Sequence, residues 1–423
     1  MCLSSHSPIG KGVALRNRVK KGHLKSAQLL NYEGHTFTTR FVHALIPKEF
    51  YHDSPGNFEK ILAYLSTNAR SCAEVGVEFE GRTFWACFVG CKGDMPFLVK
   101  AGRLERSFYN LPKQPTSKKP GRGICHLCLA GTAGVMFEDS SDGASHNLTV
   151  GEVAPWTTRP SMLVNAHDVS LPESFFQFDI WHCWHLGEGR NLVCTGMALL
   201  LDDVVQASSI PEALAQLFDD YCSFCQRARR QRYLLAFRKD FFHLEASNFP
   251  RGSWTKGNLT TSLVKWMVDY LDRHAEQVQP GSLLEGLATA LRIMDGVIKT
   301  LYRAELWLPR EQALQVAESG LQYCQLFFRL AGQAYSARRP LFLIASKVHA
   351  LDHIFRELRR QADLGSWGLN PLVWGVQLDE DLIGKCCKIG RRVSPREAVL
   401  RSFQRYMEAA HCAWEREGMI TRV

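Results

Sequence analysis

The stretch Thr36-Phe-Thr-Thr-Arg-Phe-Val-His-Ala-Leu-Ile-Pro47 is rich in β-branched and aromatic residues and ends at a proline. This composition predicts a strand. Residues 75–90, which end in Thr-Phe-Trp-Ala-Cys-Phe-Val-Gly, carry the same signals. Between them, Asn57 to Ala69 has apolar residues at helical spacing. The order strand, helix, strand favours an α/β fold.

Further along the chain, helices dominate the pattern. From Leu192 to about Leu358 apolar residues recur every three or four positions, which predicts about six or seven helices. The breaks between these helices fall at prolines: Pro211, Pro250, Pro280, Pro309 and Pro340. Phe175 to His182 is a short apolar run that fits a buried strand or the start of a helix.

Two further segments have clear signals. Residues 112–155 are rich in Pro, Gly, Ser and Lys, so we expect a loop-like insertion. Near the C-terminus, Ser394-Pro395-Arg396-Glu397 combines a capping serine with a proline at the first helical position. A last helix should therefore begin at Ser394 and run to about Arg416.

The composition bounds the class of protein. The 423 residues contain 51 Lys and Arg against 42 Asp and Glu, a net charge of +9 that permits an anionic partner. The longest uncharged apolar stretch, Leu192 to Leu201, is about half as long as a membrane-spanning helix, so we expect no membrane association. The start of the chain does not fit a signal peptide, and we expect an intracellular protein whose cysteines are mostly reduced thiols.

Three acidic segments are candidates for chemistry. Asp94 follows an apolar strand and a glycine turn, a position from which a carboxylate can hold a divalent cation, although an ordinary turn aspartate has the same pattern. Asp179 lies in an apolar run with His182 three residues on, which fits a metal site or structural pairing equally well. Asp379 and Glu380 could point toward the same site or simply begin a helix.

Cys125-His-Leu-Cys128 has the spacing of half a zinc site. We expect a structural Zn²⁺ here, completed from outside the loop, most plausibly by His182 or Cys183; two free thiols are the alternative. Cys222 and Cys225 share the spacing, but Cys225 fits better as a packed helix residue.

His349 and His353 lie one helical turn apart and could also ligate zinc. A metalloprotease needs a glutamate directly after the first histidine, and Ala350 stands there, so that class is excluded. An unrelated zinc hydrolase built on His349, His353 and a nearby acid remains a hypothesis.

A basic block follows the acidic residues 379–381. Its arginines can make bidentate contacts with phosphates, which predicts DNA binding, although runs of charge are often only solvated faces. The block contains Arg391, Arg392, Arg396, Arg401 and Arg405.

Taken in order, these motifs resemble the catalytic region of eukaryotic cut-and-paste DNA transposases. The motifs are Gly93-Asp94-Met-Pro96, the Cys-x-x-Cys at 125–128, Asp179-x-x-His182, Lys347-x-His349-x-Leu-x-His353, and Asp379-Glu380 with Gly384-Lys385. The chain is most similar to the CACTA-like and Plavaka-like groups, and to transposase-derived proteins of dinoflagellates, over about residues 36–406.

The resemblance implies an RNase H-like mixed core, interrupted by a Cys-x-x-Cys loop insertion and a large all-helical insertion. In one assignment, Asp94, Asp179 and Glu380 are catalytic and hold Mg²⁺ or Mn²⁺, with His182, Asp379, His349 and His353 as accessory residues. In the other, Asp94 is the second acid and the first one lies upstream. No aspartate precedes Asp53, so this assignment implies an N-terminally shortened, inactive copy, which we prefer slightly.

The same resemblance gives the expected domain organisation. Residues 1–35 form a basic, poorly ordered segment. Residues 36–240 form the RNase H-like core, with the insertion at about 112–170. Residues 241–345 form the helical insertion, and residues 346–423 complete the core.

The leading functional hypothesis is a transposase-like or transposase-derived protein of the nucleus that acts on DNA, as a monomer or a homo-oligomer. Its reaction would be DNA strand cleavage and transfer assisted by two metal ions held by carboxylates. A non-catalytic DNA-binding or scaffold protein derived from such an enzyme is the first rival. The zinc hydrolase is the second.

Overall fold

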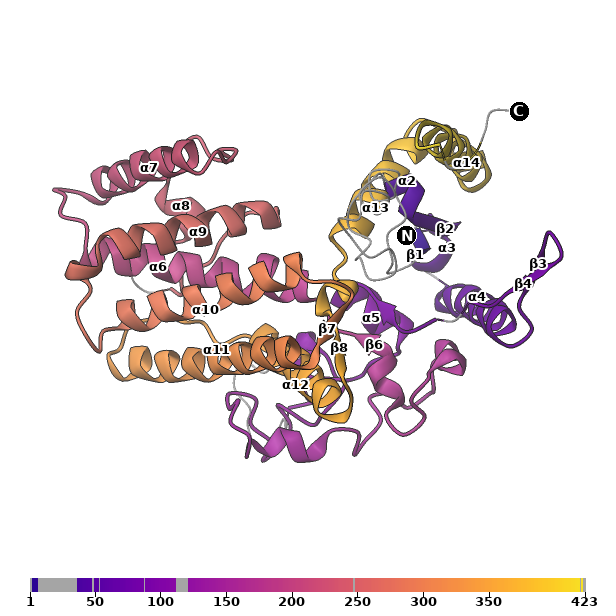
Figure 1. Ribbon diagram of the computed structural model, residues 1–423, viewed down its shortest axis with the longest axis horizontal. Helices are drawn as coiled ribbons and strands as arrows, with labels where there is room; N and C mark the ends of the chain where they lie inside the picture. The colour runs from indigo at the N-terminus through magenta and orange to yellow at the C-terminus, as the bar shows by residue number, and fades with distance from the viewer. Residues whose placement is uncertain are drawn as a thin grey trace.

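The computed structural model describes residues 2–6, 36–47, 49–52, 54–86, 88–111, 121–245, 248–418 and 420. Within these residues helices dominate, and the strands form four sheets of two strands each (Figure 1). The helix-rich α/β class is therefore confirmed. An RNase H-like core stays a prediction, because no wide mixed sheet is present in the described part of the chain.

One unit combines segments from both ends of the described chain. Strands β1 (Cys2–His6) and β2 (Arg40–Leu45) pair antiparallel, and α2 (Thr36–Thr39) precedes β2. Helices α13 (Gln377–Gly390) and α14 (Ala398–Arg416) cover them, at the upper right of Figure 1. The core of this unit contains Phe37, Val42, Leu382, Cys386, Tyr406, Ala410 and Ala413.

A second unit is built on α4 (Pro55–Glu74), which confirms the helix expected at 57–69. Short α3 (Glu49–His52) precedes it, and a hairpin of β3 (Val77–Phe79) and β4 (Arg82–Phe84) follows. The strands expected at 36–47 and 75–90 thus do not share a sheet. Each of these segments pairs locally instead, β2 with β1 and β3 with β4.

Next to α4 lies the only parallel pair among the described strands. β5 (Cys91–Lys92) pairs with β6 (Phe176–Gln177), and α5 (Met95–Ala101) follows β5. Both carboxylates expected to act together, Asp94 and Asp179, come two residues after one of these strands. Asp94 therefore follows a strand beside the segment that leads to Asp179, as expected, but this strand is Cys91–Lys92 and not the apolar run that ends near Gly90.

The loop expected at 112–155 is confirmed for its described part, residues 121–155. Among the described residues between α5 and β6, the regular structure consists of short 3-10 turns, at Phe108–Asn110, Ser145–Thr149, Ser161–Asn165 and Pro172–Phe175. Residues 112–120 lie outside the described residues, as does the expected basic segment 1–35 apart from β1.

The rest of the chain is a helical bundle. A π-type helix (Trp181–Glu188) leads into α6 (Gly189–Asp203), followed by α7 (Ile210–Arg227) and short α8 (Lys239–Phe242). Then come α9 (Gly257–Arg273), a 3-10 turn (Ala275–Gln277), α10 (Leu283–Arg303), α11 (Arg310–Ser336) and α12 (Ser346–Leu364). Strands β7 (Trp307–Pro309) and β8 (Trp367–Leu369) pair beside α11 and α12, and a 3-10 turn (Pro371–Trp374) leads to α13.

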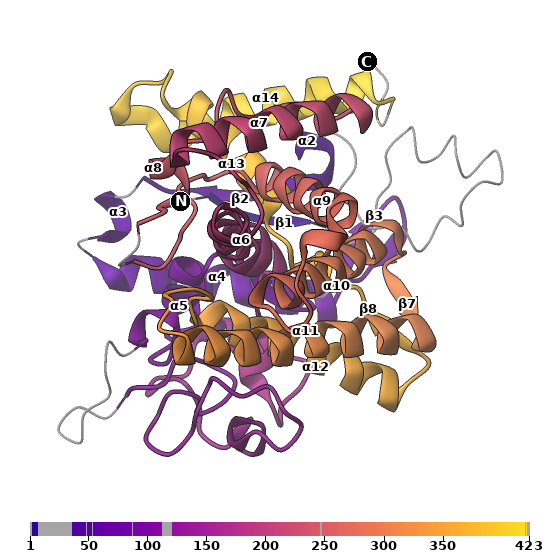
Figure 2. The same ribbon diagram turned by 90° about the vertical axis from the view of Figure 1, so that its left-hand side faces the viewer.

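The bundle matches the expected number of helices but starts earlier than residue 241. Helix α6 packs against α9 and α10, and α7 packs against α9, so all four belong to one layered bundle (Figures 1 and 2). Serine caps begin two of the helices: Ser209 accepts from the amide of Glu212, and Ser282 from that of Glu285. Ser394 stands at the expected N-cap position with Pro395 after it, but its side chain makes no capping bond, and Pro395–Glu397 is a 3-10 turn before α14. The expected end of the last helix at about Arg416 is confirmed.

Candidate metal centre

Cys125 and Cys128 lie in a tight turn of the loop, and both are fully buried. The amide of Leu127 donates to Sγ of Cys125 at 3.3 Å, an arrangement that suits a thiolate. Arg106 fixes the turn from behind, since its guanidinium donates to the carbonyls of Cys125 and His126 at 3.0 and 3.3 Å. The loop therefore holds two sulfur atoms on a backbone that is fixed by hydrogen bonds from Arg106.

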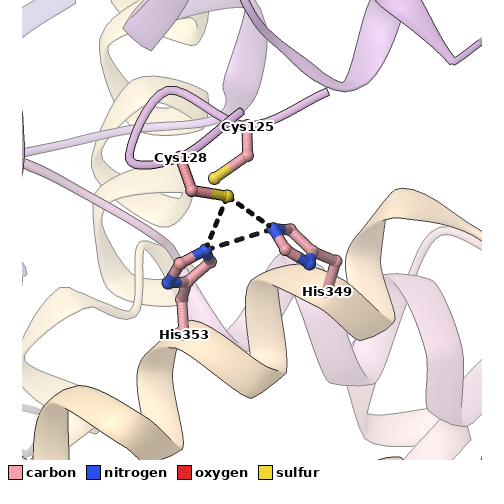
Figure 3. Close-up of side chains that lie close together, drawn as sticks. All are labelled: Cys125, Cys128, His349 and His353. Carbon is pink, nitrogen blue, oxygen red and sulfur yellow. Dashed lines mark hydrogen bonds between the residues drawn. The ribbon is translucent and has the colours of Figure 1, made fainter. Parts of the chain in front are cut away.

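Helix α12 supplies two histidines to the same point. Sγ of Cys128 lies 3.3 Å from Nε2 of His349 and 3.3 Å from Nε2 of His353, and the two Nε2 atoms are 3.1 Å apart. Figure 3 shows the two histidines and Cys128 converging beside Cys125. The four ligand atoms, one from each residue, lie within 4.8 Å of one another. A tetrahedral zinc ion would place sulfur and nitrogen ligands roughly 3.5 Å apart, so the spacing fits with little adjustment.

This arrangement corrects the ligands that we expected for Cys125 and Cys128, and it brings two separate sequence motifs into one group. His182 and Cys183, which we expected to complete the cysteine pair, are not part of the group. His349 and His353 take their place, so the two half-motifs form one buried Cys2His2 cluster that could bind a metal. Cys225 packs in α7, as expected, and is 4% exposed.

The donor set and its burial decide the kind of metal site. Two thiolates and two imidazoles are the ligands of structural zinc, and a catalytic zinc needs an open position for water. His349 and His353 are 1% and 6% exposed, so no side of the group faces solvent. A solvent-open trio of the kind that a zinc hydrolase needs is therefore not formed by these histidines.

Polar groups surround the cluster and hold α12 to the loop. Asp352, which is fully buried, accepts from Nε of Arg356 at 2.8 Å and contacts Nε2 of His146 at 3.4 Å. His146 packs edge-on against His349, with ring centroids 4.6 Å apart. Arg356 also donates to the carbonyls of Ser140 and Ser141, so α12 holds the loop at a second point. These hydrogen bonds do not reach the ring of His349, whose Nδ1 is buried without a hydrogen-bond partner among the described residues; they hold the loop and α12 together around the ligands.

Asp179, His182 and Glu380 form a separate group, which we call the acidic site. Nδ1 of His182 donates to Asp179 at 2.5 Å, and Nε2 donates to Glu380 at 3.2 Å. Burial alone would lower the pKa of His182, but the hydrogen bonds to Asp179 and Glu380 outweigh it and raise the pKa to about 9. His182 is therefore an imidazolium between two carboxylates at neutral pH.

The other acids have partners of their own. Asp94 caps α5, where its Oδ1 accepts from the amide of Phe97 at 3.0 Å. Asp379 forms ion pairs with Lys92 at 2.9 Å and with Arg40 at 3.6 Å. The structure thus brings Asp179 and Glu380 to His182, where they contact opposite nitrogens of the imidazole ring.

These carboxylates do not form a ready-made site for divalent ions. Within the described residues, the Cys2His2 cluster is the only group of at least three His, Cys, Asp or Glu whose ligand atoms lie that close together. Asp94, Asp179 and Glu380 do not meet this condition. Their catalytic assignment stays a prediction.

The arginines of the basic block are exposed: Arg391, Arg392 and Arg396 lie in the connection between α13 and α14, and Arg401 and Arg405 lie on α14. Two of them have partners: Arg401 pairs with Glu397, and Arg405 donates to the carbonyl of Arg392. The side chains of the remaining three, Arg391, Arg392 and Arg396, are exposed on the surface. DNA binding by this block stays a prediction.

Sequence reasoning missed His146 and Arg106. Neither lies in a spaced motif, and only the folded chain brings them to the metal ligands. Asp352 lies next to a ligand, His353, and this adjacency was its only signal.

Comparison of the chain with protein-family models, with curated proteins and with solved structures found no match. Among the described residues, none of the helices is both long and apolar enough to cross a membrane.

Proposed function

We propose that this chain is a zinc-stabilised, transposase-derived DNA-binding protein that does not carry a preformed two-metal catalytic site. The observation that carries the proposal is the acidic site, where the cation between Asp179 and Glu380 is His182. An enzyme with two metal ions needs carboxylates facing the ions across a shared space about 3.5–4 Å wide. Here an imidazole ring occupies the space between the two carboxylates.

The zinc part of the proposal rests on the Cys2His2 cluster. Its donor set, spacing and burial fit a closed structural zinc ion, which would tie the loop to α12. Burial and the neighbouring Cys125 raise the pKa of the Cys128 thiol, so zinc must displace a proton when it binds. Metal analysis of the purified chain should find one zinc per molecule.

The DNA part rests on the exposed arginines and on the net charge of +9. Phosphate contacts by arginine release counterions, so binding should weaken steeply as salt rises. We expect the triple variant Arg391→Ala, Arg392→Ala, Arg396→Ala to bind a labelled DNA duplex more weakly. Its salt slope should be smaller by about one for each arginine that binds a phosphate in the wild type.

A matched control removes the same charge elsewhere. Arg229, Arg232 and Arg238 are exposed on the helical bundle, and their replacement by alanine also lowers the net charge by three. This control should bind nearly as well as the wild type in the same fluorescence anisotropy titration. Equal losses in both variants would mean that only the overall charge matters, and unchanged binding in the first would overturn the DNA-binding proposal.

Metal-dependent strand cleavage is the second candidate function. It is favoured by one observation: Asp179 and Glu380 reach the same residue from segments far apart in the chain. If divalent ions displaced His182, both carboxylates would be available as oxygen ligands.

A nicking assay on supercoiled DNA with Mg²⁺ or Mn²⁺ separates the two functions. Under our proposal, the wild type nicks no faster than Asp179→Asn or Glu380→Gln. Activity that both variants lose by more than about 100-fold, and that Asp381→Asn on the same helix keeps, would establish cleavage instead.

A further inference from the structure

The helical turn that carries His182 is distorted. Residues Trp181–Glu188 form a wide π-type helix, and Gly187 within it has φ −129° and ψ −109°, outside the helical range. A break of this kind leaves carbonyl oxygens without their usual amide partners. Carbonyl oxygens that lack these partners need donors from another element. Isolated π-type turns also occur frequently at functional sites.

Lys347 supplies these donors. Its Nζ donates to the carbonyl oxygen of His182 at 2.9 Å and to that of Leu186 at 3.2 Å. The lysine thus spans the distorted turn from its beginning to the residue before the break. It holds the backbone of His182 directly.

Gly187 makes this approach possible. A Cβ atom at position 187 would lie 2.4 Å from Cδ of Lys347 and 2.7 Å from the carbonyl oxygen of His182. Contacts below 3.0 Å are not tolerated, so any other residue would displace the lysine or the backbone that it holds. The close approach of Lys347 to the backbone therefore requires a glycine at position 187.

Lys347 lies on the helix that carries the metal ligands. It is in the first turn of α12, two positions before His349 and six before His353. Because each residue adds about 1.5 Å to an α-helix, Lys347 and His353 are only about 9 Å apart along the axis. The three side chains therefore move together with α12. Whatever fixes His349 and His353 against the loop therefore also fixes Lys347 against the turn of His182.

We propose that Lys347 is a positioning residue that couples the metal centre to the acidic site. Zinc fixes α12, and Lys347 on α12 holds the backbone of His182 so that its ring lies between Asp179 and Glu380. Loss of zinc releases α12 and loosens this turn. The inference rests on the proposed zinc centre and adds a dependence of the acidic site on that centre.

Hydrogen exchange of the full chain, measured by mass spectrometry with and without a zinc chelator, tests the coupling. In the wild type, zinc removal should raise exchange in peptides that cover residues 179–188 as well as residues 346–353. In zinc-loaded Lys347→Met, exchange at 179–188 should already be raised, and zinc removal should add nothing there while still raising exchange at 346–353. Such non-additivity is the mark of two groups that act through one contact.

Two further variants sharpen the test. Gly187→Ala displaces the lysine from the other side and should reproduce the pattern of Lys347→Met. Lys60→Met makes the same chemical change on an exposed lysine of α4 and should behave as the wild type.

A spectroscopic readout separates positioning from general loss of stability. In histidine-labelled Lys347→Met, the imidazole nitrogen signals of His349 and His353 should keep their zinc-bound positions, whereas that of His182 should move. Movement of all three would show that the variant simply destabilises the region and would overturn the assignment.

The proposal also fails if zinc removal leaves exchange at 179–188 unchanged in the wild type. Metal analysis distinguishes this from failure of the zinc centre itself. A chain that contains zinc but shows no coupling disproves only the role of Lys347, whereas a chain that binds no zinc disproves both.

Discussion

Cys128 is the residue on which the metal centre depends most, because its Sγ lies within 3.3 Å of both histidine nitrogens. We expect Cys128→Ser to abolish stoichiometric zinc and to lower the free energy of unfolding by more than about 3 kcal/mol, since a structural metal contributes folding energy. Metal analysis and urea unfolding measure the two effects. Cys412→Ser, at an exposed free cysteine, is the control. A Cys128→Ser protein of unchanged stability would contradict a structural role.

Glu188 predicts a pH dependence. It is 1% exposed, and neither carboxyl oxygen has a hydrogen-bond partner among the described residues. Burial raises its pKa from 4.5 to about 8, against the opposing charge of Lys347. Between these two values the folded chain holds a proton that the unfolded chain has lost. The free energy of unfolding should therefore fall as the pH rises through this window, by up to about 1.4 kcal/mol per pH unit.

Glu188→Gln removes this titration and keeps the shape. Urea unfolding should give similar stabilities for the variant and the wild type below pH ~4.5, where both side chains are neutral. At pH 8 the variant should be the more stable of the two. Glu276→Gln, at an exposed glutamate, should follow the wild type at both values. A parallel pH dependence in Glu188→Gln would assign the effect to other groups.

At this scale, spacing identified the ligand types but not their pairing. Cys125 with Cys128 and His349 with His353 each carry a local signal that survives in the structure. Their union does not follow from sequence, because Cys128 and His349 are 221 positions apart. His182 was the nearer choice along the chain, but Asp179 and Glu380 bind both of its ring nitrogens.

At the scale of elements, helices were predicted well and strands poorly. The helices of the bundle have apolar faces and proline breaks, which are local signals. The strand expected at 36–47 begins instead as α2, where Thr36 donates to Asp381 on α13 and Phe37 packs on Tyr406 of α14. These contacts come from the far end of the chain, so no local pattern reports them.

The contact between α14 and β2 gives a prediction for this unit. The hydroxyl of Tyr406 accepts from the amide of Val42 at 3.1 Å and donates to the carbonyl of Arg40 at 3.2 Å. Tyr406→Phe keeps the ring but leaves both backbone groups without this partner, and it should cost about 1–3 kcal/mol of stability.

Urea unfolding measures this loss, and Tyr335→Phe is the control because its side chain is 84% exposed. Hydrogen exchange should place the effect at residues 40–45. An unchanged stability would mean that water replaces the hydroxyl at no cost.

At the scale of the whole molecule, the loop and the bundle share one core. Ile124, Ala130 and Phe137 of the loop are buried in the same cluster as the residues of α11 and α12. Apart from this cluster, polar contacts attach the loop, such as the bond from Gln325 to the carbonyl of Ser140 at 3.2 Å. Since the loop contains little regular structure, we expect zinc to contribute much of what holds it in place.

Zinc removal should therefore loosen the loop before it unfolds the bundle. Chymotrypsin can report this, because Phe137 is only 8% exposed while the loop is closed. In the presence of a chelator we expect cleavage at Phe137 to accelerate, while a fragment that covers residues 189–364 persists. Added zinc should restore protection in the wild type but not in Cys128→Ser, which should be cut rapidly without a chelator. If the chelated wild type resisted cleavage at Phe137 as the loaded protein does, the apolar contacts and Arg356 would suffice to hold the loop, and the metal would have no part in closing the core.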